Sequence, residues 1–488
     1  MRDGRPTAQA GALVARLQAA PDYGMRAEDY GAVALAARLA GTGTTAASPP
    51  TGGADLDRDL SAAALRFAHD LHFGRVDARS AGFALPAARP PLDDQALLSR
   101  LAVSQDLAAE FARLEPQYLH YRLLKSALLH YRELAQQPAL TALPPLPVRA
   151  LHAGDHYAGA DALRRLLIAL GDCGPQPAPS SYAATQTFDS ELAAALQKFQ
   201  QRHGLAADGV LAAKTFAALT TPLQQRAHQL ELTLERWRWL PAFAAPPIIV
   251  NIPQFRLFAF RTTDDRAADI EQMAVIVGQA YRQKRTPVFL SELRYVVFRP
   301  YWDVPRSIVH NEMLAPMRAD LRYLERNKLE LIRGGGDDGT VVPPTPENIE
   351  ALAAGELRLR QRPGADNALG LVKFVMPNDY GVYLHSTPAR QLFERARRDF
   401  SHGCIRVSDP VALAVHVLRG TEGSWDAAAV EQAMQGADAL RVPLAVPVPV
   451  MVLYGTALAT EAGPVQFFDD IYGHDHRLDA LLRARRPL

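Results

Sequence analysis

Cysteine is scarce in this chain of 488 residues, which contains only Cys173 and Cys404. A disulfide between these two would be the only one that the sequence can form. We expect no such bond, because the motif around Cys404 favours a thiol that must stay free to react. Cys173 is then interpreted as a structural or incidental residue.

The chain also lacks long apolar runs, and its net charge is close to zero. No apolar run approaches the length of a membrane span, and residues 1–6 lack the apolar core of a signal peptide. With 53 basic and 52 acidic residues the formal charge is +1, which excludes a global attraction to nucleic acid. The hydrophobic fraction of 48% is ample for buried cores, and the length predicts roughly two to four domains. By themselves, these features predict a cytoplasmic protein of several domains.

One stretch carries the residues of a nucleophilic site. Residues 383–388 read YLHSTP and residues 401–407 read SHGCIRV, so His385 and Cys404 lie 19 positions apart and must be brought together by the fold. A thiol near its free pKa is mostly protonated at neutral pH, so a nucleophilic cysteine needs a neighbouring imidazole to take its proton. The stretch therefore predicts a catalytic pair of Cys404 and His385.

The neighbours of this pair have predicted roles of their own. The second ring nitrogen of His385 needs an acceptor, and the backbone carbonyl of Ser386 is a candidate. Gly403 permits a tight turn, whose backbone amide, with that of Cys404, is placed to receive the oxyanion of a tetrahedral intermediate. Arg406 adds a fixed positive charge suited to a substrate carboxylate.

A structural role is the alternative for each of these residues. A lone cysteine and a lone histidine are more often buried core groups than a nucleophile pair, and Arg406 would then be an ordinary surface residue. The complete run SHGCIR favours the catalytic interpretation, because it resembles the signature of the L,D-transpeptidases of bacterial cell walls, the YkuD-type catalytic domain.

The spacing of apolar residues divides the chain into five parts. Residues 1–148 predict an α-helical scaffold domain, and residues 149–223 predict three short helices. Residues 224–245 predict a connecting helix, and residues 246–455 predict short strands typical of a β sandwich. The tail, residues 456–488, is predicted to be an appended helix or docking segment. The predicted fold class is therefore multidomain α+β with a mainly-β catalytic domain.

Two of these parts extend the resemblance. Residues 199–215 are similar to the three-helix peptidoglycan-binding domain of many wall enzymes, with a small helical spacer as the alternative. Residues 277–289 and 300–308 look like the longer, YcbB-type members of the transpeptidase family. That likeness implies a mobile cap over the site at residues 306–368, although the sequence is equally compatible with a rigid surface excursion.

The resemblance implies a peptidoglycan substrate and no metal or cofactor. Cys404 would be acylated by a stem tetrapeptide and pass the acyl group to a neighbouring stem, giving a 3→3 crosslink in wall biogenesis or remodelling. His402, Tyr383 and Trp302 are predicted to line the substrate pocket. The expected partners are stem peptides, glycan and wall-synthesis proteins, and carbapenems are expected to acylate the site. These properties imply the periplasm or cell envelope, so we expect an export segment or membrane anchor that is absent from this sequence.

Other activities have to be weighed against crosslinking. With water as the acceptor the same site would be an L,D-carboxypeptidase. The sequence does not determine whether water or a stem amine accepts the acyl group. A papain-like or NlpC-type peptidase is less consistent, because in those families the cysteine precedes the histidine. A catalytically weak wall-binding scaffold predicts loss of Cys404 or His385, yet both are present.

Overall fold

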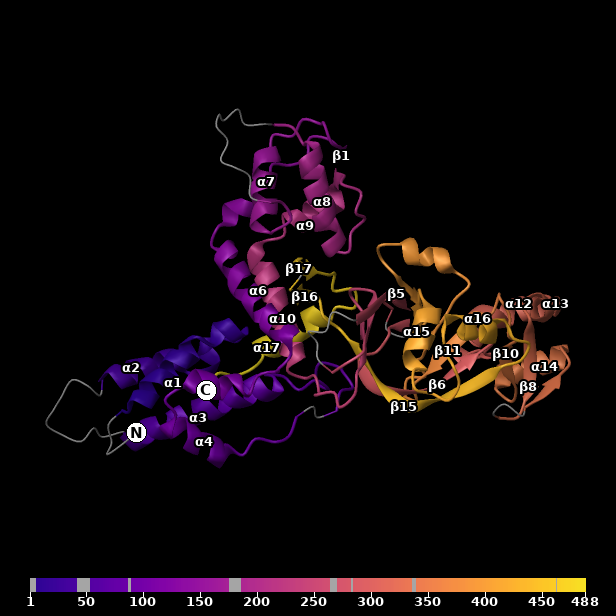
Figure 1. Ribbon diagram of the computed structural model, residues 1–488, viewed down its shortest axis with the longest axis horizontal. Helices are drawn as coiled ribbons and strands as arrows, with labels where there is room; N and C mark the ends of the chain where they lie inside the picture. Colours follow the sequence, from indigo (N-terminus) through magenta and orange to yellow (C-terminus); the bar gives the residue numbers. More distant parts are fainter. Residues whose placement is uncertain are drawn as a thin grey trace.

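The computed structural model describes residues 6–41, 53–86, 89–174, 186–263, 270–281, 284–335, 339–461 and 463–488. They form an elongated molecule with N-terminal helices at one end and a strand-rich region at the other (Figure 1). A further group of helices projects from the middle. The predicted class, multidomain α+β, is confirmed.

The N-terminal helices close one apolar core, which has Phe67 at its centre. The rings of Tyr23, Tyr30 and Phe111 meet Phe67 edge to face at centroid distances of 5.6, 5.1 and 5.0 Å. The helices of this core are α1 (Ala8–Gln18), α2 (Ala32–Gly41), α3 (Gly53–Phe73), α4 (Asp94–Val103) and α5 (Leu107–Ala112).

The long helix α6 (Leu119–Ala135) belongs to a different core, although it lies inside the predicted scaffold of residues 1–148. It packs against α10 (Leu223–Trp237), the predicted connecting helix, and against the C-terminal hairpin β16 (Ala457–Thr460) and β17 (Gly463–Phe467). The apolar face of α6 is therefore covered by segments that follow it by about 90 to 350 residues, which helical periodicity alone cannot identify.

The projecting group is a small unit with its own core. It contains the three predicted helices α7 (Ala160–Ala169), α8 (Ser190–Arg202) and α9 (Ala213–Leu219). The side chain of Asp189 caps α8 by accepting from the Leu192 amide. The short strands β1 (Ala150–Leu151) and β2 (Leu211–Ala212) pair antiparallel and hold its two halves together.

Nine strands of the described residues form the mainly-β region, in the order β13-β5-β14-β12-β11-β6-β15-β3-β4. Strand β4 pairs with both β3 and β5, so the ladder closes on itself and is not the two-sheet sandwich that we expected. Closure is achieved because the first half of β5 pairs with β4 and its second half with β14. The bounds are β3 (Ile248–Asn251), β4 (Arg256–Phe260), β5 (Ile270–Gly278), β6 (Phe289–Phe298), β11 (Val372–Val375), β12 (Leu384–His385), β13 (Asp399–Ser401), β14 (Ile405–Val407) and β15 (Leu440–Leu453). Helices α15 (Pro410–Val417) and α16 (Ala427–Gln435) pack on it.

The insertion within this region has a sheet and a core of its own. Its sheet has the order β7-β10-β8-β9 and begins at Trp302, slightly before the predicted start at residue 306. The elements are β7 (Trp302–Asp303), α11 (Arg306–Ile308), the π-helical turn η5 (Val309–Met313), α12 (Leu314–Ala319), α13 (Arg322–Arg326), β8 (Leu329–Arg333), β9 (Thr340–Val342), α14 (Pro346–Ala354) and β10 (Arg358–Gln361).

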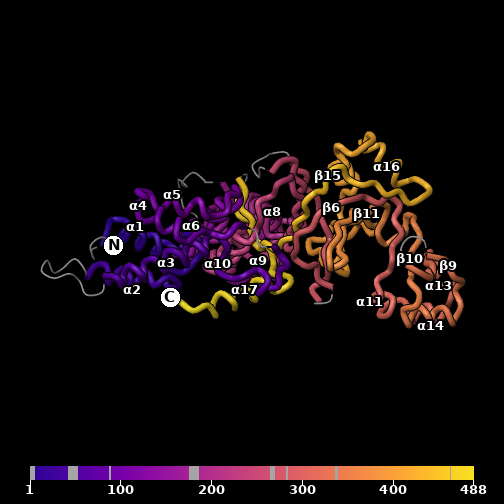
Figure 2. The backbone as a smooth tube through the Cα atoms, turned by 90° about the horizontal axis from the view of Figure 1, so that it is seen from below, coloured from indigo at the N-terminus to yellow at the C-terminus, as the bar shows by residue number. Residues whose placement is uncertain are grey.

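The C-terminal segment returns to the helical end of the molecule. Helix α17 (His474–Arg483) lies beside α10, and Figure 2 shows this yellow segment running under the indigo helices. Arg485 then donates two hydrogen bonds of 2.6 Å to the carboxylate of Asp70 on α3. The tail thus connects the mainly-β region to the first helical core. None of the helices built from the described residues combines the length and apolarity needed to cross a membrane.

Candidate active site

Two neighbouring parallel strands bring the predicted pair together. Strand β12 pairs with β14, with Leu384 opposite Ile405 and His385 opposite Arg406. The Ile405 amide also donates to the Tyr383 carbonyl at 3.0 Å. Since Cys404 directly precedes β14, it lies at the end of the strand pair that carries His385. The pairing of β12 with β14 therefore closes the gap of 19 positions between the two residues.

Both residues line one cleft of about 650 Å³. Of the sequence-predicted site residues, the cleft brings together Trp302, Tyr383, His385, His402, Gly403, Cys404 and Arg406. Part of the wall comes from the insertion, through Ile308, Glu312 and Met313. Ser386 is buried behind this surface and acts through its main chain. A volume of this size is typical of sites for small molecules and peptides.

His385 is buried and held in one orientation. Its Nδ1–H donates to the Ser386 carbonyl, with 2.6 Å between the atoms, as the sequence predicted. Burial, together with the charges of Arg406 and Lys373, lowers the pKa of His385 to about 3, and the hydrogen bond to Ser386 opposes this shift. The imidazole is therefore neutral, and its Nε2 is left as an acceptor for a proton.

Cys404 is partly exposed, and its thiol is protonated at rest. Burial raises the pKa of Cys404, although hydrogen bonds from Tyr383 and the charges of Lys373 and Arg406 lower it. Its Sγ lies 3.7 Å from the Gly381 carbonyl oxygen, and no hydrogen bond joins it to His385 within the described part of the chain. The Gly381 carbonyl therefore accepts the thiol proton at rest, and this weak contact must break before the imidazole can take the proton.

The turn before the nucleophile is fixed from both sides. Gly403 has φ of 121°, a conformation that favours glycine. Its amide donates to Ser401 Oγ at 3.1 Å, and its carbonyl accepts from Thr286 Oγ1 at 2.8 Å. The Gly403 amide thus already has an acceptor, which leaves the Cys404 amide as the better placed donor of the predicted pair. Ser401 and Thr286 were not identified from the sequence, since nothing in their local pattern signals these contacts.

A lysine that we did not predict lies beside the pair. Lys373 on β11 is the direct partner of His385 in the antiparallel pairing with β12. Its Nζ lies 4.0 Å from the centre of the half-buried Tyr383 ring, and desolvation raises the pKa of Tyr383 well above the usual value. Lys373 and Arg406 flank His385 on its two neighbouring strands, so positive charge surrounds the position of a developing thiolate.

His402 connects the nucleophile turn to the insertion. Its Nε2 lies 2.7 Å from Glu312 Oε1 and 2.8 Å from Lys284 Nζ. Nε2 donates to Glu312 when it carries a hydrogen and accepts from Lys284 when it does not, so it makes only one of these bonds at a time. Burial raises the pKa of Glu312, but the hydrogen bonds from His402 and Lys284 outweigh it, and the net shift is downward.

Arg406 has a free hydrogen-bond donor at the cleft. Its guanidinium is half buried, which lowers its pKa, and among the described residues its Nε has no partner. An unpaired buried donor of this kind is costly unless a ligand satisfies it. Within the same described ranges, no cluster of three or more histidine, cysteine or acidic side chains is arranged to hold a metal ion.

Comparisons with known proteins agree with this architecture. Residues 246–430 match the family described as L,D-transpeptidase catalytic domain, with the family name YkuD. Residues 1–128 match a family described as Scaffold domain, and residues 159–219 match one described as "Putative peptidoglycan binding domain".

A protein of Haemophilus influenzae, named "Putative L,D-transpeptidase", is 33% identical over 252 residues. That alignment covers 51% of this chain and 49% of the relative, so the chain spans about half the length of the curated relative that it matches.

Proposed function

Because the chain carries a YkuD-type L,D-transpeptidase catalytic domain together with a peptidoglycan-binding domain, we propose that it forms 3→3 crosslinks between peptidoglycan stem peptides through an acyl-enzyme on Cys404. The observation that carries the proposal is the common cleft of Cys404 and His385, which reach it from two adjacent parallel strands. The proposed substrate is a stem tetrapeptide that ends in D-Ala.

The first half of the reaction is acylation. His385 Nε2 takes the proton from Cys404, and Sγ attacks the carbonyl that joins the L-centre of diaminopimelate to D-Ala. The Cys404 amide donates to the oxyanion that forms. His385 then gives the proton to the departing nitrogen, the C–N bond breaks, and D-Ala leaves. A thioester between the tripeptide carbonyl and Cys404 remains.

The second half transfers the acyl group. The side-chain amine of diaminopimelate on a neighbouring stem loses its proton to His385 and attacks the thioester carbonyl. The C–S bond breaks, an amide between the two stems forms, and the thiolate recovers the proton from His385. Neutral His385 and neutral Cys404 are restored, which are the forms favoured by the directions of their pKa values.

Two charged side chains support these steps in the proposal. The unpaired Nε of Arg406 is suited to a substrate carboxylate. Lys373, together with Arg406, lowers the free energy of the thiolate, because both charges lower the pKa of Cys404. We place the activity in the cell envelope, in contact with stem peptides, glycan and wall-synthesis proteins.

Incubation of the purified chain with disaccharide-tetrapeptide, followed by separation and mass spectrometry of the products, tests the proposal. Dimers with a 3→3 linkage, absent with Cys404→Ala, would support it. Release of D-Ala that leaves only tripeptide would identify an L,D-carboxypeptidase. Unchanged substrate, with no thiol adduct on exposure to a carbapenem, would favour a wall-binding scaffold.

A further inference from the structure

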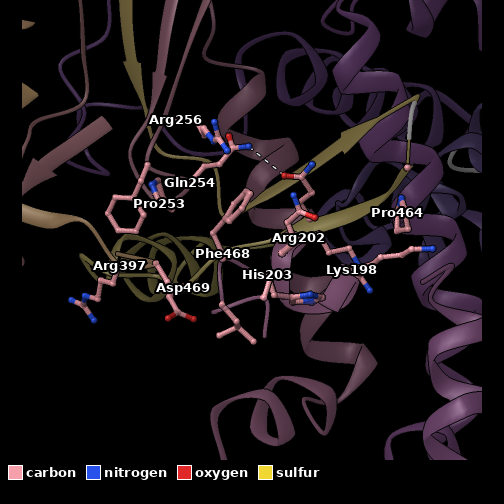
Figure 3. Close-up of a pocket in the computed structure, with 18 of the residues that line it drawn as sticks. Lys198, Arg202, His203, Pro253, Gln254, Arg256, Arg397, Pro464, Phe468 and Asp469 are labelled. Atoms are coloured by element: carbon pink, nitrogen blue, oxygen red, sulfur yellow. Dashed lines mark hydrogen bonds between the residues drawn. The ribbon is translucent and has the colours of Figure 1, made fainter. Parts of the chain in front are cut away.

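A second cavity, of about 550 Å³, lies where three parts of the chain meet. The segment around Pro253–Arg256 in the mainly-β region forms one side, and the end of α8 with Lys198 and Arg202 forms the opposite side (Figure 3). Phe468 and Asp469 of the C-terminal segment lie between them. The size is in the range of ligand-binding cavities.

The three parts are joined around this cavity by specific contacts. Gln254 Nε2 donates to Gln466 Oε1 at 3.3 Å, shown as a dashed line in Figure 3. Arg202 donates to both carboxylate oxygens of Asp172, at 2.7 and 2.5 Å, and to the Val465 carbonyl at 2.5 Å. Buried contacts of this kind fix the position of α8 relative to the C-terminal hairpin, so the cavity is a built feature of the junction.

Positive charge exceeds negative charge on the wall of the cavity. Its carboxylates are Asp172 and Asp469, and Asp172 is already paired with Arg202. The cationic side chains on the wall are Lys198, Arg202, Arg256, Arg397 and Arg398. No ion pair joins Lys198, Arg256 or Arg398 to a carboxylate in the described ranges of the chain. The three uncompensated charges would attract an anionic ligand.

Arg398 shows this excess most clearly. Its side chain is half-buried, and within the described residues its guanidinium donates only to backbone carbonyls, including those of Phe255 at 3.1 Å and Val275 at 3.2 Å. Burial and the nearby charge of Arg256 lower the pKa of Arg398 to about 10. An anion in the cavity would supply a counter-charge to Arg398 and would raise its pKa again.

The cavity is connected along the chain to the nucleophile. Arg397 and Arg398 directly precede β13, which leads into the turn at Gly403 and Cys404. In the C-terminal segment, Ile471 lines this cavity, and His474, three residues later, lines the active-site cleft. A peptidoglycan stem bound in this cavity would therefore contact two segments of the chain that continue into the lining of the active-site cleft.

We propose that this cavity binds the carboxylates of peptidoglycan stem peptides, with Lys198 and Arg256 as the recognition residues on its two sides. The proposal rests on the proposed function, and it assigns to the junction a second stem site that is separate from the cleft at Cys404. Glycan without stem peptides lacks these carboxylates, so the cavity would select wall material whose stems are intact.

Co-sedimentation of the whole 488-residue chain carrying Cys404→Ala with insoluble wall sacculi tests this site without turnover. The test variant adds Lys198→Gln and Arg256→Gln, both at exposed positions, and the control variant adds Lys214→Gln and Arg165→Gln, which remove the same charge elsewhere. We expect roughly a tenfold rise in the apparent Kd for the test variant at low salt, because charge-assisted contacts to carboxylates are lost. The control should retain the parent Kd.

A parallel measurement uses labelled soluble glycan strands, from which an amidase has removed the stems, and follows binding by fluorescence anisotropy. Binding to this glycan should be equal in the parent and test variants. Equal Kd values on intact sacculi, an equal loss in the control variant, or an equal loss on stripped glycan would each overturn the proposal.

Carbapenem acylation of Cys404, measured by intact mass in Lys198→Gln/Arg256→Gln with Cys404 present, should match the wild type. Failure of wild-type acylation would count against the proposed function and not against this cavity.

Discussion

His385 and Arg406 are direct partners in the parallel pairing of β12 and β14. The guanidinium thus lies beside the imidazole, and its charge is, after burial, the next largest cause of the low pKa of His385. An imidazole that stays neutral in acid can still accept a proton from Cys404. The pairing of His385 with Arg406 therefore positions the general base and also predicts the pH range in which that base is active.

The first prediction concerns the pH dependence of acylation. The rate needs neutral His385, so it should fall as pH drops through the pKa of that group, which is about 3, and stay level from about pH 5 to 8. Arg406→Gln removes a positive charge that opposes the imidazolium, so this pKa should rise, by about one unit, and the acid limb should move to higher pH.

The second-order rate of carbapenem acylation between about pH 2 and 8, a range that includes the pKa of about 3, measures this effect. Arg419→Gln removes an exposed charge that does not line the cleft and should leave the profile unchanged. An acid limb in Arg406→Gln at the wild-type position would contradict the electrostatic role of Arg406.

The second prediction separates the two thiols. Cys404→Ala should lower crosslinking by about 10³-fold or more, because the acyl acceptor is lost, and should abolish the carbapenem adduct in the intact mass. Cys173 is buried in the core of α7 to α9 and lines neither cavity. Cys173→Ala should therefore keep the adduct. An adduct that survives Cys404→Ala would place the nucleophile elsewhere.

The third prediction concerns the turn at Gly403. A Cβ at this position would have room, since its nearest neighbours are backbone oxygens at 3.6 and 3.9 Å, but φ of 121° is unfavourable for alanine. Gly403→Ala should lower the free energy of unfolding by about 1–3 kcal/mol and slow acylation, because the Cys404 amide shifts.

Chemical denaturation and acylation rates measure the two effects. Gly11→Ala, on α1, provides the control, because its backbone is helical and no atom lies within 4 Å of the added Cβ. It should leave acylation unchanged and stabilise the chain by up to about 1 kcal/mol. Wild-type stability and rate in Gly403→Ala would show that the turn conformation is not needed.

The fourth prediction concerns the contact between the insertion and the nucleophile turn. Glu312→Gln removes the ion pairs of Glu312 with His402 and Lys284. Exposed pairs contribute only about 0–1 kcal/mol each, so the melting temperature should change little. Amide exchange in residues 309–313 should instead rise several-fold, because the insertion is held less firmly at the cleft.

Hydrogen–deuterium exchange with mass spectrometry measures this change. Glu350→Gln breaks a comparable exposed pair with Arg318 on the same insertion and serves as the matched control. It should not alter exchange near Glu312. Equal exchange in Glu312→Gln and wild type would mean that the cap is held by apolar contacts alone.

Local patterns were sufficient for much of the fold. Helices α7 and α8 lie within residues 149–223, where three short helices were predicted, because apolar spacing of 3.6 residues is a property of each segment by itself. Strands β3 and β4 follow from short runs of β-branched and aromatic residues for the same reason. Local patterns did not reveal the short strands β13 and β14 on either side of Gly403 and Cys404, since three residues carry too little periodicity.

The sequence by itself determined the types of residue in the site, the order of helical and strand-rich parts, and the orienting carbonyl of Ser386, because these depend on neighbours along the chain. The tertiary structure alone decided that the ladder closes through β4 and β5, that Lys373 lies beside His385, and that Gly403 donates to Ser401. It also decided that the Cys404 thiol is turned to Gly381 and that a cationic cavity forms at the junction of three parts. Each of these features depends on residues brought together by long-range pairing and packing, which a pattern along one segment does not encode.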